Sequence, residues 1–80
     1  MDDGDLLRRI QELADEERGL EEAHVGEALA PKERERLRRI EVELDQCWDL
    51  LRQRRARRSV GQDADGATTR PEGVVEHYRQ

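Results

Sequence analysis

Two carboxylates beside a tryptophan are the first residues whose types could do chemistry. Asp45 and Asp49 are four positions apart and lie beside Trp48, so on a helix they share one face and could hold a divalent cation or act as an acid and base pair. Carboxylates on an exposed helix more often stay solvated or pair with arginine, here Arg52. We therefore predict no catalytic residue, no metal site, no cofactor and no enzyme activity.

The other candidates for chemistry are one cysteine, Cys47, and two histidines, His24 and His77. Their spacing matches no structural zinc pattern, and a lone cysteine forms no disulfide within its chain. Nearby arginines could lower the pKa of the Cys47 thiol and make it reactive, or the thiol could bridge two subunits. Because Cys47 falls at a core position, we expect a small buried side chain. His24 is expected near Glu33, and neither histidine has a nucleophile to activate.

Five arginines form a basic cluster near residue 55, and arginine forks bind phosphate well. The cluster comprises Arg52, Arg54, Arg55, Arg57 and Arg58. It has no interleaved aromatic residues and matches no helix-turn-helix or RNA-binding motif, and the net charge of the chain is −5, which disfavours nonspecific binding to nucleic acid. A regulator associated with nucleic acid is therefore the alternative function and not the main one.

Periodic apolar residues predict two helices that position these side chains. The first runs from about residue 5 to 23, with an N-cap at Asp3 or Asp5, and the second from about 31 to 58, starting at Pro31 and stopping before Gly61. Residues 24–30 form the turn between them. Heptad spacing defines a seam on each helix: Leu6, Ile10, Leu13, Glu17 and Leu20 on the first, and Leu37, Ile40, Leu44, Cys47 and Leu51 on the second, which the stem of Arg54 extends.

The two seams are in phase with each other about one centre. Leu6 and Leu51 lie at equal sequence distances from the point between Ala28 and Leu29. The same holds for each following pair when one seam is read forwards and the other backwards, as far as Leu20 and Leu37. A short turn forces neighbouring helices to be antiparallel, and a continuous hairpin requires this symmetry. We therefore predict an all-α fold, an antiparallel two-helix hairpin that resembles a coiled coil. Its register also brings the acidic residues 2–5 near the basic residues 52–55.

Apolar residues beside the seam point to a second contact. Trp48 directly follows a seam residue and lies on the flank where Leu7 and Ala14 also project. Two helices cannot cover both the seam and this flank, so we expect another hairpin or the C-terminal arm to fill it. The first option gives a homodimer, in the form of a four-helix bundle.

Residues beyond the hairpin divide into a polar linker, 61–71, and a short C-terminal arm or helix, 72–80. Val74, Val75 and Tyr78 are helically spaced in the arm, which is too short to be stable unaided. We expect it to dock on the hairpin or on a partner. The candidate interaction surface is thus Leu7, Trp48, Arg52, Arg54, Arg55, Arg58, Val74, Val75 and Tyr78.

Composition limits the chain to one small domain. It has 80 residues, of which 34% are hydrophobic, so its core is thin and helix packing or oligomerisation must supplement it. The first residues are acidic where a signal peptide is basic, and no apolar run approaches the ~18 residues of a membrane span. We expect a cytoplasmic protein without membrane contact, whose role is interaction with an unknown protein partner or self-assembly.

The segment from Leu44 to Arg55 reads LDQCWDLLRQRR, and a Gly- and Asp-rich linker and a terminal Val75-Glu76-His77-Tyr78 follow it. In these features the chain resembles a family of short actinobacterial proteins known only as a domain of unknown function. The resemblance covers nearly the whole chain and implies a small helical protein. It implies no activity, substrate or cofactor.

Overall fold

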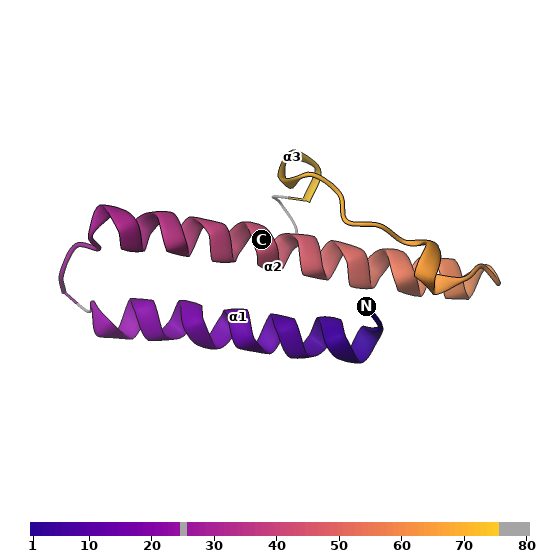
Figure 1. Cartoon of the computed structure of the whole chain (residues 1–80), viewed down its shortest axis with the longest axis horizontal. Coiled ribbons are helices and arrows are strands. Elements are labelled where there is room, and N and C mark those ends of the chain that lie inside the picture. Colours follow the sequence, from indigo (N-terminus) through magenta and orange to yellow (C-terminus); the bar gives the residue numbers. More distant parts are fainter. Residues whose placement is uncertain (25, 76–80) are drawn as a thin grey trace.

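A computed structural model describes residues 1–24 and 26–75, which form a helical hairpin and a segment folded back along its second helix (Figure 1). Helix α1 spans Asp3–Ala23 and helix α2 spans Pro31–Ser59, and they run antiparallel. A single 3-10 turn, η1, covers Ala64–Gly66, and a one-turn helix, α3, covers Glu72–Val75. The described residues contain no β-strand. The predicted all-α hairpin is confirmed.

Helix α1 begins two residues earlier than the apolar pattern predicts, because Asp2 is its N-cap and not Asp3 or Asp5. The Asp2 carboxylate accepts a hydrogen bond from the backbone N–H of Asp5 at 2.8 Å. The Asp5 carboxylate in turn accepts from the N–H of Asp2 at 3.2 Å. This reciprocal capping box satisfies two backbone donors that a helix start otherwise leaves without partners.

The turn between the helices is closed by a contact between their ends. The His24 ring lies at the end of α1, and its Nε2 is 2.7 Å from Oε2 of Glu33 in the first turn of α2. The other Glu33 oxygen accepts from the Ala30 N–H at 3.0 Å. One carboxylate thus caps α2 and joins it to α1, and the expected proximity of His24 and Glu33 is confirmed.

The core lies along the seam between α1 and α2. Its buried members are Leu6, Ile10, Leu13, Ile40, Leu44, Cys47 and Leu51, with Leu20 and Leu50 partly buried against them. Leu13 and Ile40 are completely shielded from solvent. The register predicts four fully apolar pairs, and their residues all pack in this cluster apart from Leu37, which is half-buried. Burial of apolar area at about 25 cal/mol per Å² is the main force that holds the hairpin together.

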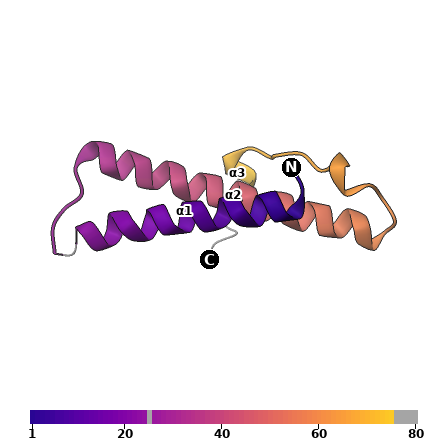
Figure 2. The same cartoon turned by 60° about the horizontal axis from the view of Figure 1, so that its bottom comes forward.

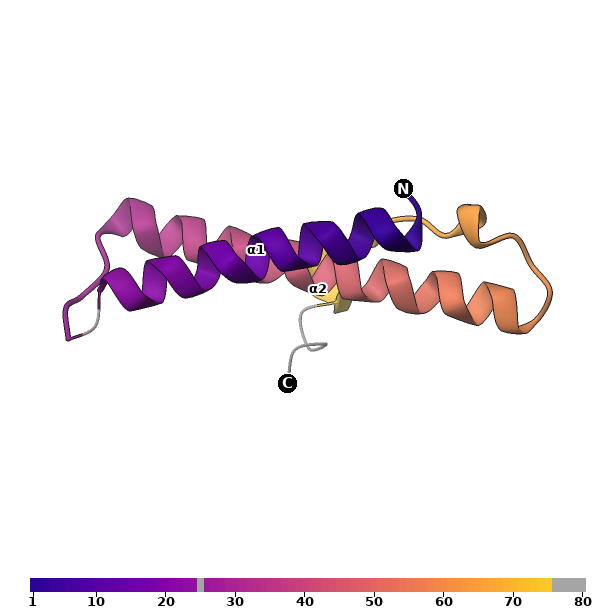
Figure 3. The same ribbon diagram turned by 90° about the horizontal axis from the view of Figure 1, so that it is seen from below.

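Helix α2 is the middle layer of the molecule. It extends beyond the start of α1, and after the reversal at Gly61 the chain returns along α2 on the side away from α1 (Figures 1 and 2). We call residues 62–75 the strap. Seen from below, α1 and α2 cross at a shallow angle (Figure 3). Within the described ranges no helix has a stretch apolar enough to span a bilayer.

Candidate interaction surfaces

The strap covers the two carboxylates that sequence analysis placed on an exposed helix face. Asp45 is 5% exposed and Asp49 is completely buried. Nε of Arg70 donates to Oδ2 of Asp49 at 2.8 Å, and Arg70 Nη2 bonds the other carboxylate oxygen. The expectation of solvated carboxylates is therefore wrong, because the strap folds back over them. The other option, pairing with an arginine, holds for Asp49, which binds Arg70 of the strap.

Arg70, Gln46 and Gln53 hold the strap against α2, and sequence reasoning did not predict their contacts. Gln53 donates from Nε2 to the carboxylate of Asp49 and to the backbone carbonyl of Thr68, both at 2.8 Å. Gln46 donates to the backbone carbonyl of Arg70 at 3.3 Å. These contacts join α2 to a segment without periodicity, so no spacing in the sequence signals them.

The arginine cluster at the end of α2 is divided between internal pairs and solvent. Arg54 has a side chain only 8% exposed, and it donates to Asp3 at 2.6 Å and to Asp65 at 2.9 Å. Arg58 also donates to Asp3 through both of its terminal nitrogens. These two arginines hold the pKa of the Asp3 carboxyl below its usual value. Arg54 therefore does not belong to an exposed surface, contrary to the sequence-based expectation.

The remaining arginines of the cluster differ in their surroundings. Arg52 and Arg55 are exposed. Arg57 is half-buried, and its guanidinium lies so close to Gly66 that a Cβ atom there would stand 2.5 Å from Nη1. The acidic start of α1 and the strap thus both compete for this end of α2. The competition weakens the nucleic-acid alternative, which requires free arginines.

The Trp48 flank, defined by Leu7, Ala14 and Trp48, is open to solvent. Leu7 is 45% exposed and Trp48 is 41% exposed. The strap runs along the side of α2 away from α1 (Figure 1) and leaves Leu7 and Trp48 exposed, while within α3 Val75 is buried and Val74 is exposed. Val75 therefore leaves the candidate interaction surface, while Tyr78 and His77 lie outside the described residues.

The opposite flank of the hairpin is closed by ion pairs. Arg9 binds Glu43 through two hydrogen bonds, of 2.5 and 3.0 Å. Arg36 binds Glu16 in the same two-pronged way, at 2.5 and 2.6 Å. Each pair joins α1 to α2 next to the seam. The two flanks therefore differ in kind, one charged and paired, the other apolar and exposed.

Cys47 is a buried member of the core, as its seam position predicts. The side chain is 8% exposed, and desolvation raises the pKa of its thiol. A thiol nucleophile reacts as the thiolate, so both effects disfavour reactivity. In the described part of the chain, moreover, no three His, Cys, Asp or Glu side chains are grouped in a way that could hold a metal ion.

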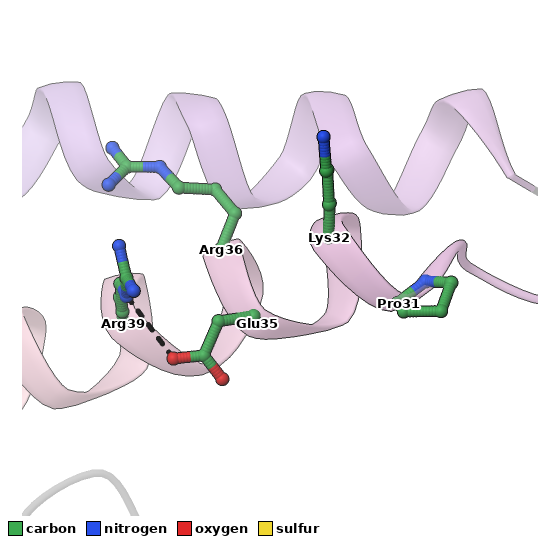
Figure 4. Close-up of a pocket in the computed structure, with 5 residues that line it drawn as sticks. All are labelled: Pro31, Lys32, Glu35, Arg36 and Arg39. Carbon is green, nitrogen blue, oxygen red and sulfur yellow. Dashed lines mark hydrogen bonds and ion pairs between the residues drawn. The ribbon is translucent and has the colours of Figure 1, made fainter.

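A shallow hollow of about 400 Å³ lies at the start of α2, beside the turn (Figure 4). Its lining residues are Pro31, Lys32, Glu35, Arg36 and Arg39. Glu35 accepts a hydrogen bond from Arg39 at 3.2 Å, and Arg36 is engaged by Glu16. Most of the positive charge in the hollow is thus neutralised by neighbouring carboxylates, and the hollow adds no further candidate site.

Comparison with known proteins supports the resemblance drawn from the sequence. The chain is 48% identical over 77 residues to the uncharacterized protein Mb0922c of Mycobacterium bovis and, to the same extent, to the uncharacterized protein Rv0898c of Mycobacterium tuberculosis. The match covers 95% of this chain and 88% of each relative. No solved structure matches the chain significantly. A family model matches residues 2–80, and the chain therefore belongs to the actinobacterial family described as protein of unknown function DUF2630.

Proposed function

We propose that this protein is a small self-assembling interaction module, whose Trp48 flank binds the same flank of a second copy. The observation that carries the proposal is the contrast between the two flanks of the hairpin. One is closed by the Arg9–Glu43 and Glu16–Arg36 pairs, and the other exposes nearly half of Leu7 and of Trp48. Exposed aromatic and aliphatic side chains on one face are a common signature of protein interfaces.

A second copy fits this flank because an acidic and a basic residue lie on opposite sides of Trp48, so that two copies related by a twofold axis place opposite charges together. Glu41 and Arg55 lie at equal sequence distances on either side of Trp48, about two helical turns away along α2. A twofold axis through Trp48, with the two α2 helices antiparallel, places Glu41 of each copy against Arg55 of the other. Both side chains are exposed, and within the part of the chain that the structure describes neither has an ion-pair partner.

The thin core gives assembly a thermodynamic role. Chains of this size rarely gain more than ~3–5 kcal/mol from a single core, and packing a second hairpin on the exposed flank enlarges it. An isologous contact is also the commonest way in which soluble proteins oligomerise. The proposed setting is the cytoplasm, where an unpaired thiol such as Cys47 stays reduced. The proposed role is assembly without catalysis.

Analytical ultracentrifugation of Trp48→Ala tests the interface. The substitution should shift the wild-type dimer towards monomer, because it removes the largest apolar side chain of the flank. Val60→Ala is the matched control, since Val60 is 69% exposed but lies at the far end of α2. A wild-type chain that sediments as a monomer at all concentrations, or a Trp48→Ala chain that remains equally dimeric, would overturn the proposal.

Charge exchange tests the twofold arrangement separately. Glu41→Arg and Arg55→Glu should each weaken the dimer, because each sets like charges against one another across the interface. The double variant restores opposite charges and should recover association. If the double variant associates more weakly than both single variants, the helices do not pair about Trp48.

A further inference from the structure

The strap is held on α2 by a pattern of contacts that resembles recognition of an extended peptide. We propose that the outer face of α2 is a binding surface for an extended segment that carries an arginine, and that the strap of a second copy can replace the chain's own strap there. The face consists of Gln46, Asp49 and Gln53, and Arg54 at the end of the seam adds a contact to Asp65. This surface is separate from the Trp48 flank, so the inference does not depend on the proposed dimer.

The central contact is between a buried carboxylate and the arginine of the bound segment. Asp49 is completely buried and receives the Arg70 guanidinium through a two-pronged contact. Arginine binds a carboxylate in this geometry with more directional specificity than lysine, because its planar fork matches the two oxygens. Gln53 also donates to Asp49 and keeps the carboxylate in place. The face thus selects an arginine at one position of the segment.

The two glutamines recognise the backbone of the segment. Gln53 donates to the carbonyl of Thr68, and Gln46 donates to the carbonyl of Arg70, two residues further along the strap. Side-chain amides that bind main-chain carbonyls at this spacing favour an extended chain, whatever its side chains. Further anchors lie at both ends of the strap, where Asp65 binds Arg54 and Val75 is completely buried.

The strap is separable from the hairpin that it covers. Both η1 and α3 pack against α2 and not directly against α1. With three and four residues, neither is stable as an isolated helix. The strap is held on α2 mainly by hydrogen bonds and ion pairs, whereas the hairpin is held together by its apolar seam. Segments of this kind open at a lower free energy than the core around them.

The connection between α2 and the strap lets the strap turn away. Gly61 has φ +78, a left-handed conformation that glycine adopts without strain, and it reverses the chain. Rotation at this residue carries the strap off its own helix without disturbing the seam. An identical strap from a second copy then meets the same contacts, and exchange of identical elements is a low-cost route to association.

The test uses the full-length chain with Arg70→Ala, together with a synthetic peptide of residues 62–80. In the variant, loss of the Asp49–Arg70 contact should increase amide exchange at Gly66 and Ala67, whose N–H groups donate to Asp63 and Ala64 in the bound strap. Addition of the wild-type peptide should return the side-chain amide NMR signals of Gln46 and Gln53 towards their wild-type positions. A peptide with Arg70→Ala should bind at least roughly tenfold more weakly, about 1.4 kcal/mol.

A control variant and three outcomes determine whether the outer face of α2 binds the strap as proposed. Full-length Arg34→Ala is the matched control, since it removes an exposed arginine of α2 that lies outside both the strap and the proposed dimer interface, and its strap amides should keep wild-type protection. If Arg70→Ala leaves the strap fully protected, Asp49–Arg70 is not its central contact. If the wild-type peptide leaves the Gln46 and Gln53 signals unchanged, or if both peptides bind equally, the outer face of α2 does not bind this segment in trans and the inference is wrong.

Discussion

Arg54 of α2 joins Asp3 at the start of α1 to Asp65 in the strap, with Nε and Nη1 lying 2.6 and 2.9 Å from the two carboxylates. Three segments of the chain meet at this one guanidinium. Its side chain is almost fully shielded from water, so its charge requires both carboxylates as compensation. The seam position of Arg54 is therefore occupied by a charged group that links all three parts of the fold.

Arg54→Ala should lower the free energy of unfolding and also loosen the strap. Two carboxylates lose a partner at once, and removal of a shielded arginine leaves a gap at the end of the seam. Arg34→Ala, at an exposed position near the start of α2, should have little effect. Urea unfolding followed by circular dichroism compares the two variants. Equal unfolding midpoints would mean that the contacts of Arg54 contribute nothing to stability.

Acid should destabilise the fold through carboxylates whose pKa is lowered by arginine. Arg58 and Arg54 lower the pKa of Asp3, and Arg36 lowers that of Glu16. A carboxyl with a lowered pKa in the folded state stabilises the protein above its unfolded pKa, and this contribution disappears as pH falls through the folded value. Stability should thus be constant near neutral pH and decline below about pH 4.5. Unfolding measured from pH 7 to pH 2 checks this.

An Asp3→Asn chain supplies the control for the acid experiment. It lacks one of the responsible carboxylates, so it should be less stable than the wild type at pH 7, and the difference should narrow as pH falls. A constant difference across the pH range would show that the ionised form of Asp3 is not what stabilises the fold.

Leu13→Ala should be strongly destabilising, by about 2–5 kcal/mol, because it opens a cavity at a completely buried seam position. Val60→Ala, at an exposed position, should change stability by less than about 0.5 kcal/mol. Chemical denaturation of both variants at one protein concentration gives the comparison. A small effect of Leu13→Ala would mean that the seam relaxes around the cavity.

Native Cys47 should react slowly with a thiol reagent such as Ellman's reagent, and rapidly once the chain is unfolded in urea. Burial limits access to the sulfur, and the raised pKa reduces the thiolate fraction. Labelling of the native protein as fast as that of a free thiol would contradict the buried position.

The hairpin was predictable from the sequence, whereas the position of the strap was not. Heptad spacing places Leu13 and Ile40 in one core, and the symmetry of the two seams brings His24 to Glu33. Both follow from periodicity, which repeats a signal many times along a helix. Contact between Asp49 and Arg70 depends on how an irregular segment turns after Gly61, a step encoded by few residues and no repeat.

The same distinction explains the Trp48 flank. Its apolar character was evident from the position of Trp48 after Cys47, but the C-terminal arm could have filled it as well as a second hairpin. The structure places α3, the described part of the arm, on the side of α2 away from α1, and the buried side chain of α3 is Val75. The contact between Asp49 and Arg70 fixes the side of α2 on which the strap packs. Helical spacing alone contains no information about such a pairing.

Helix α2 is packed on two opposite sides, by α1 along the seam and by the strap on its outer face. Side chains on both sides have contacts to maintain, and of the two stripes between them one carries Trp48, which the proposed dimer uses, and the other carries Glu43, which binds Arg9. Substitutions anywhere around α2 therefore remove a contact. During divergence of the family, α2 should change more slowly than α1, which the described residues cover along the seam only.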